Sequence, residues 1–232
     1  MSITAHDWIT RSTVDATVLE RWPDYRVILV AAVHVDTAAL AAVAERLHTD
    51  AHEVARSHEP GEPDEHTARW HQAYRDFGIK PRVARPSIDV LVRRAASEKE
   101  LPRINVLVDL YNAISILHRV PIGGEDLDRY QGPARLILAN GDEPFHTTVA
   151  GEATVDHPDP GEPVWIDDKG ITCRRWNWRQ TTRTAIQPGT VRVGFIIDSL
   201  DAPDHMGAVR AAEQLARLLR DPHLHTIDAT TR

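Results

Sequence analysis

The sequence contains a single cysteine, Cys173, among 232 residues. No disulfide can form within the chain, which fits a reducing compartment. The amino terminus lacks the basic start and apolar run of a signal peptide, and no apolar stretch approaches the length of a membrane span. From these absences we expect a cytoplasmic protein with no membrane partner.

An excess of positive charge is also absent. Lysine and arginine number 27 against 34 aspartates and glutamates, which gives a net charge of -7. Because proteins that coat duplex nucleic acid are usually strongly basic, we expect no DNA partner, and any RNA contact must come from a local patch. The apolar content of 42% is sufficient for a sizeable core.

Sequence motifs for metal or nucleophilic catalysis are missing as well. His48 and His52 have helical i, i+4 spacing with Glu53 beside them, but a zinc site needs a further ligand and no HExxH motif is present. We prefer a solvated histidine-rich face and expect no metal and no cofactor. A lone Cys173 in a strand-like run is more typical of a small buried residue than of a nucleophile.

The order of secondary structure predicts an α+β fold. A buried strand at 25–35 precedes a helix-rich half, and a strand-rich half with a final helix follows. The expected helices cover 38–58, 66–78, 88–98 with Ser87 as N-cap, 102–119, and 205–221; the expected strands cover 134–139, 143–149, 162–167, 171–178 and 190–198. We expect one domain over 1–232, with its core at about 20–220.

The predicted helix at 102–119 is apolar around most of its circumference. Its exceptions, Asn105, Asp109 and Asn112, have the spacing of one helical face. This polar stripe either faces solvent or lines a pocket. Amides and a short carboxylate, which orient polar ligands in apolar clefts, favour the pocket.

Arginine and tryptophan alternate in the segment RRWNWRQ. On a strand, Arg175, Asn177 and Arg179 share one face, and Trp176 and Gln180 the other. Arginine offers a planar fork for phosphate or carboxylate, and tryptophan a platform for a base. The alternative is that the tryptophans pack inward while the arginines are solvated. Because the two amides are not favoured in strands, we interpret the segment as a binding site.

Two segments resemble a known family, the freestanding B3/B4 domain proteins. They are PSIDVLVRRAASEKELPRINVLVDLYNAISILHRVPIGGEDLD at 86–128 and VWIDDKGITCRRWNWRQTTRTAI at 164–186. These proteins are similar to the editing module in the β-subunit of bacterial phenylalanyl-tRNA synthetase. The resemblance implies a compact α+β fold with a β-sandwich-like core and flanking helices, and a cleft for the 3′ end of a charged tRNA.

The synthetase module hydrolyses the ester of a wrongly attached amino acid. The resemblance therefore implies a trans-editing aminoacyl-tRNA deacylase, with aminoacylated tRNA as its partner. The editing histidine of the synthetase is replaced at about Gly123, and RRWNWRQTT stands where the synthetase has small residues. Removal of tyrosine is consequently not implied, and no catalytic residue is assigned.

We expect a positioned water to attack the ester, with orientation and oxyanion stabilisation lowering the barrier. Arg175 or Arg179 would hold the terminal phosphate or the carbonyl oxygen, and Asp109 would pair with the α-ammonium group. The ribose, the water and the α-amino group would be oriented by Asn105, Asn112, Asn177 and Gln180. Two alternatives remain open: a non-catalytic tRNA- or RNA-binding module, and a metal-dependent hydrolase of small esters or amides. The sequence does not predict the oligomeric state.

Overall fold

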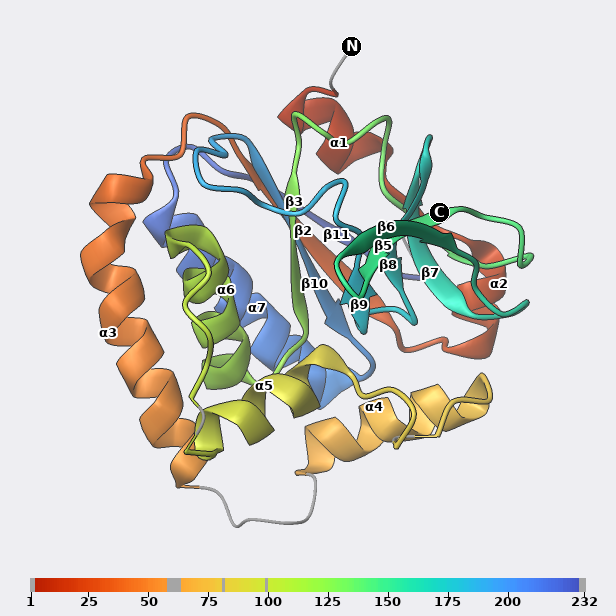
Figure 1. Ribbon diagram of the computed structural model, residues 1–232, viewed down its shortest axis with the longest axis horizontal. Helices are drawn as coiled ribbons and strands as arrows, with labels where there is room; N and C mark the ends of the chain where they lie inside the picture. Colours follow the sequence, from red (N-terminus) through yellow and green to blue (C-terminus); the bar gives the residue numbers. More distant parts are fainter. Residues whose placement is uncertain (1–2, 58–63, 81, 99, 230–232) are drawn as a thin grey trace.

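A computed structural model describes residues 3–57, 64–80, 82–98 and 100–229 (Figure 1). The helices of these residues are α1 (Ala5–Arg11), α2 (Ala16–Arg21), α3 (Thr37–Arg56), α4 (Glu65–Asp76), α5 (Ser87–Ala96), α6 (Val106–His118) and α7 (Ala202–Leu218). The strands are β1 (Thr13–Val14), β2 (Arg26–Ala32), β3 (Ile122–Asp126), β4 (Arg135–Leu138), β5 (Phe145–Val149), β6 (Glu152–Asp156), β7 (Pro163–Asp167), β8 (Gly170–Arg174), β9 (Arg179–Gln180), β10 (Val193–Ser199) and β11 (His223–Ile227). None of the described helices is long and apolar enough to cross a membrane.

The central layer is an antiparallel sheet of order β11-β2-β10-β3. Its middle strands are continuous apolar runs because both faces of the sheet are covered. Side chains alternate between the faces, so Val27 and Leu29 of β2 enter one core cluster, while Ile28 and Val30 enter another.

The layers on either side of this sheet differ in kind. Helices α3, α6 and α7 cover one face, seen at the left of Figure 1. The other face packs against a five-stranded sheet of order β1-β4-β7-β8-β9, through Leu136 and Trp165. The α+β class and the sandwich-like pairing of two sheets are thus confirmed, with helices on one outer face.

Local departures from the sequence predictions occur at element ends. The helix expected from residue 102 begins at Val106, because Asn105 caps it by accepting the Val108 N–H at 3.1 Å. Ser87 is not an N-cap; Pro86 holds that position, and no side chain caps α5. The glycine-rich stretch after α6 is the edge strand β3, which pairs with β10.

Candidate functional site

A pocket of about 380 Å³ opens where the two sheets meet α5 and α6. Tyr111, Trp165, Trp176 and Trp178 give it aromatic walls, and β3 and β10 of the central sheet form its floor. Its volume falls within the usual range for small-molecule sites, and apolar walls with few polar groups are typical of them.

The arginine–tryptophan segment is a hairpin rather than one strand. Strand β8 ends at Arg174, residues 175–178 form a turn, and β9 begins at Arg179. The turn has positive φ at Arg175 (48°) and Trp176 (66°), which no glycine in the sequence indicated. The prediction that side chains 175–180 alternate between the two faces of one strand is therefore wrong.

The turn inserts Trp176 into the core. Its ring lies 4.7 Å from that of Trp22 and 4.9 Å from that of Tyr25, measured between centroids. Arg174 is also buried, and its guanidinium donates two hydrogen bonds to Glu162, at 2.9 and 2.8 Å, which offset the loss of hydration. The inward-packing alternative is correct for Trp176, whereas Arg174 is paired and not solvated.

The next residue, Asn177, lines the pocket. The hydroxyl of Tyr74 donates to its Oδ1 at 3.1 Å, and the Ser87 N–H donates to its backbone carbonyl at 3.2 Å. These contacts fix the amide, and its buried Nδ2 has no hydrogen-bond partner among the described residues. The same holds for Oγ of Ser87, which also lines the pocket.

The two arginines of the predicted site take different places. Arg179 is exposed and lines the pocket, with its guanidinium 5.0 Å from the centre of the Trp178 ring. Arg175 lies outside the lining. Its guanidinium carbon is 4.2 Å from the centre of the Trp178 ring, and its Nε is 3.5 Å from Glu162. Arg179 forms no ion pair with any described residue.

The polar stripe of α6 is divided in the same way. Asn112 lines the pocket. Asn105 caps the helix and donates to the Ile186 carbonyl at 3.3 Å, while Asp109 accepts the Ile104 N–H at 2.9 Å. The pocket thus brings together Asn112, Asn177, Arg179 and Gln180 but not Asn105, Asp109 and Arg175.

The floor of the pocket carries two carboxyl groups that sequence reasoning missed. Glu125 of β3 is 1% exposed and Asp198 of β10 is 2% exposed, and both line the pocket. Between them lies Gly123, where an added β-carbon would meet no atom within 4 Å. For Asp198 the available signal was an acidic residue at the end of the apolar strand expected at 190–198, because such residues are rarely fully buried without a partner. The stretch around Glu125 was not expected to be a strand.

Burial raises the pKa of both carboxyl groups. The pKa of Glu125 rises to about 8, although the neighbouring side chains of Thr184 and Gln180 act to lower it. That of Asp198 rises to about 7, opposed by donors on Tyr25, Trp165 and Asn177. Acids with such values exchange protons near neutral pH, as general acids and bases must.

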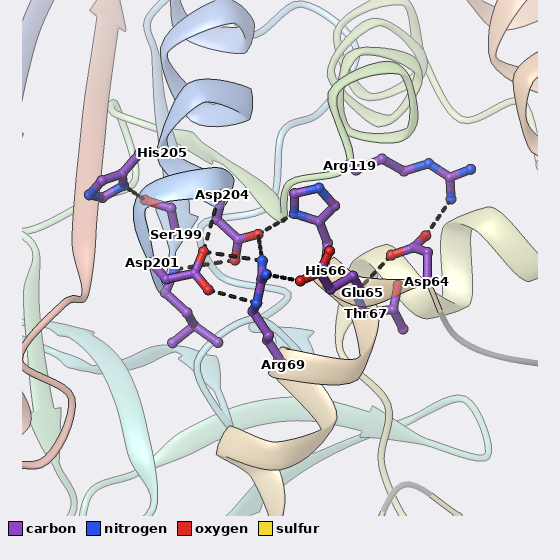
Figure 2. A network of polar contacts seen from close by, with 11 residues as sticks. Asp64, Glu65, His66, Thr67, Arg69, Arg119, Ser199, Asp201, Asp204 and His205 are labelled. Atoms are coloured by element: carbon purple, nitrogen blue, oxygen red, sulfur yellow. Dashed lines mark hydrogen bonds and ion pairs between the residues drawn. The ribbon is translucent and has the colours of Figure 1, made fainter.

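A polar network joins the first turns of α4 to α7 and to Arg119 (Figure 2). Near the N-terminus of α4, His66 contacts Asp204 of α7, and Arg69 pairs with Asp201 at 2.7 Å. One turn further on, His71 contacts the α5 carboxylate Asp89 at 2.8 Å. None of these residues lines the pocket, but the His71–Asp89 contact joins α4 to α5, which forms part of the pocket wall. Further along α4, Tyr74 donates a hydrogen bond to Asn177 of the pocket.

The remaining candidates of the sequence do not form a centre of their own. His48 and His52 are buried, with ring centroids 4.7 Å apart, so the expected solvated face is wrong. No group of three or more potential metal ligands occurs among the described residues. Cys173 lines the pocket, but burial raises the pKa of its thiol well above the ordinary value, which disfavours a nucleophilic thiolate.

Comparison with known proteins matches residues 69–219 to the model of the B3/4 domain family. The match covers more than half of the chain, which therefore belongs to this family. Among solved structures, the chain is similar to an N-terminal fragment of the phenylalanyl-tRNA synthetase β-subunit from Pyrococcus horikoshii, with 11% identity and a TM-score of 0.45. That alignment covers 92% of this chain and 49% of the fragment, so the chain spans about half the fragment's length. No curated protein matches.

Proposed function

We propose that the protein hydrolyses the ester between an amino acid and the 3′ end of tRNA, acting in trans on mischarged tRNA in the cytoplasm. The observation that carries the proposal is the pocket itself. Ser87, Glu125 and Asn177, which line this aromatic-walled space, each have a buried polar atom with no hydrogen-bond partner among the described residues. Such atoms cost free energy until a ligand or water satisfies them. The membership in the B3/4 family supports tRNA as the source of that ligand.

The groups of the pocket suit an aminoacyl ester. The ester is already activated, so orientation of a water and stabilisation of the oxyanion lower the barrier sufficiently. The aromatic walls would hold the amino acid, and Asn112 and Gln180 at the lining would orient the ribose. Arg179, exposed at the same pocket, would contact the terminal phosphate.

The test is a deacylation assay on a panel of tRNAs charged with different amino acids. We expect wild-type protein to cleave at least one ester faster than spontaneous hydrolysis. Gly123→Leu should abolish this cleavage, because its side chain enters the pocket from an open position. Thr148→Leu, on the exposed face of β5, is the matched control. If micromolar protein accelerates no member of the panel, the deacylase proposal is wrong.

Binding measurements separate the enzyme from the non-catalytic RNA-binding alternative. Affinity for tRNA should fall with salt, and Arg179→Ala should weaken it, whereas the exposed Arg46→Ala on α3 should not. Salt-sensitive binding without turnover of any charged tRNA would favour the binding module.

A further inference from the structure

Asp198 occupies a distinctive position at one end of the pocket floor. The Tyr25 hydroxyl donates to its Oδ1 at 2.6 Å. The indole of Trp165 and the amide of Asn177 lie close enough to lower its pKa, yet Nε1 and Nδ2 have no hydrogen-bond partner among the described residues. The end near Asp198 therefore combines one proton acceptor with two N–H donors that lie beside it and have no other hydrogen-bond partner among the described residues.

The other carboxyl group has different surroundings. In the sheet register Glu125 pairs with Gly194, four residues from Asp198 along β10, so the backbone positions of the two residues are roughly 13 Å apart along the strand. The nearby Gln180 already donates to the Gly124 carbonyl. The Nε of Arg183, which interacts electrostatically with Glu125, also has no hydrogen-bond partner among the described residues, but Arg183 does not line the pocket. The two ends are therefore suited to different parts of a substrate.

We propose that Asp198 is the general base that activates the hydrolytic water, and that the N–H groups of Asn177 and Trp165 hold the resulting oxyanion. This inference rests on the proposed deacylase function. Asp198 takes one proton from water as the water oxygen bonds to the ester carbonyl carbon. When the tetrahedral intermediate collapses, the bond from this carbon to the ribose oxygen breaks, and Asp198 returns the proton to that oxygen. The products are the amino acid and uncharged tRNA, and Asp198 is regenerated.

The other titratable groups near Asp198 stay neutral around its pKa of about 7. Burial raises the pKa of Tyr25, Tyr74 and Cys173 well above their ordinary values. Glu125, with a pKa of about 8, is the other floor group that titrates nearby. We therefore expect the rate to change near pH 7 as Asp198 titrates. The Glu125→Gln variant removes the titration of Glu125 and shows which of the two carboxyl groups causes the change.

The experiment measures single-turnover deacylation against pH, using the charged tRNA that wild-type protein cleaves. Wild type should gain rate through about pH 7 as Asp198 ionises. Asp198→Asn should lose about 100- to 10,000-fold in rate and lose this transition. Tyr25→Phe keeps the carboxylate but removes a hydrogen bond that lowers its pKa, so the transition should move to higher pH. Glu125→Gln should leave the position of the transition unchanged.

Binding controls distinguish loss of chemistry from loss of structure. Asp198→Asn should bind an analogue with an amide in place of the ester as tightly as wild type does. If wild type cleaves but Asp198→Asn keeps its rate and transition, this inference is wrong while the deacylase function stands. An unmoved transition in Tyr25→Phe would overturn it too, even if Asp198→Asn does not fold. If wild type cleaves nothing, the deacylase function itself fails.

Discussion

Gly123 and Gly124 are neighbours on β3 whose surroundings differ sharply. A β-carbon at Gly123 would meet no atom within 4 Å. At Gly124 it would lie 2.6 Å from Cε1 of Tyr111 and 2.8 Å from Cδ1 of Ile186. Tyr111 is packed against Phe195, with ring centroids 5.8 Å apart, which restrains movement of its ring. Alanine should therefore be tolerated at Gly123 but not at Gly124.

The size of the difference follows from two terms. Either alanine restricts the unfolded chain and thereby stabilises the protein by about 0.4–1 kcal/mol. Gly124→Ala alone also overpacks the core, at a cost of about 1–3 kcal/mol. Because the first term is common to both variants, Gly124→Ala should be less stable than Gly123→Ala by about 1–3 kcal/mol, or roughly 2–12 °C in melting temperature.

Urea unfolding followed by tryptophan fluorescence measures this difference directly. Wild type and both alanine variants are compared at neutral pH, with thermal unfolding as a second measurement. Equal midpoints for the two variants, or a less stable Gly123→Ala, would refute the register of β3. The assignment of Gly123 to the open pocket would then fail as well.

Three further predictions concern titratable groups. Burial acts to raise the pKa of Asp89, but hydrogen bonds from His71 and two arginines outweigh it and lower that pKa. Asp89→Asn should therefore lower the free energy of unfolding by about 1–3 kcal/mol in urea titrations at pH 7. The difference should shrink below about pH 4, where protonation of Asp89 removes its stabilising contribution. Burial raises the pKa of Glu125 from 4.5 to about 8, so the folded state loses stability as pH rises between these values. Glu125→Gln should therefore raise the melting temperature more at pH 8.5 than at pH 5. Equal shifts at the two pH values would contradict the raised pKa. Burial also raises the pKa of the Cys173 thiol, so iodoacetamide should label it far more slowly in native protein than in concentrated urea, as mass spectrometry would detect.

The fold class was predictable because it depends on features that are local in sequence. Apolar runs such as that of β2 report burial on both faces, and the order of helices and strands reports the class. The turn after Arg174 was not predictable in this way. Positive φ at Arg175 and Trp176 is imposed by tertiary contacts, above all by burial of Trp176 in the core. Local strand propensity was overridden there.

The candidate site was predictable only in part, because residue type does not reveal which polar side chains are already hydrogen-bonded to the backbone. Asn105 and Asn112 look alike in sequence, but helix α6 begins between them, so the first is a cap and the second lines the pocket. Asp198 was overlooked because it ends a strand read as core, and Glu125 because the glycine-rich stretch around it was not expected to be a strand. Their significance appears only when the register places both at one cavity.

Residues outside the segment matched to the B3/4 family affect the protonation of a carboxyl group in the pocket. Every residue that lines it falls within 69–219. The hydrogen bond on Asp198, however, comes from Tyr25, immediately before β2, and β2 pairs with β10 along its whole length. The matched segment alone would leave β10 without this neighbour, and the Asp198 carboxylate without its Tyr25 donor. The protonation state of Asp198, and with it the reaction we propose, therefore depends on a segment outside the residues matched to the family model.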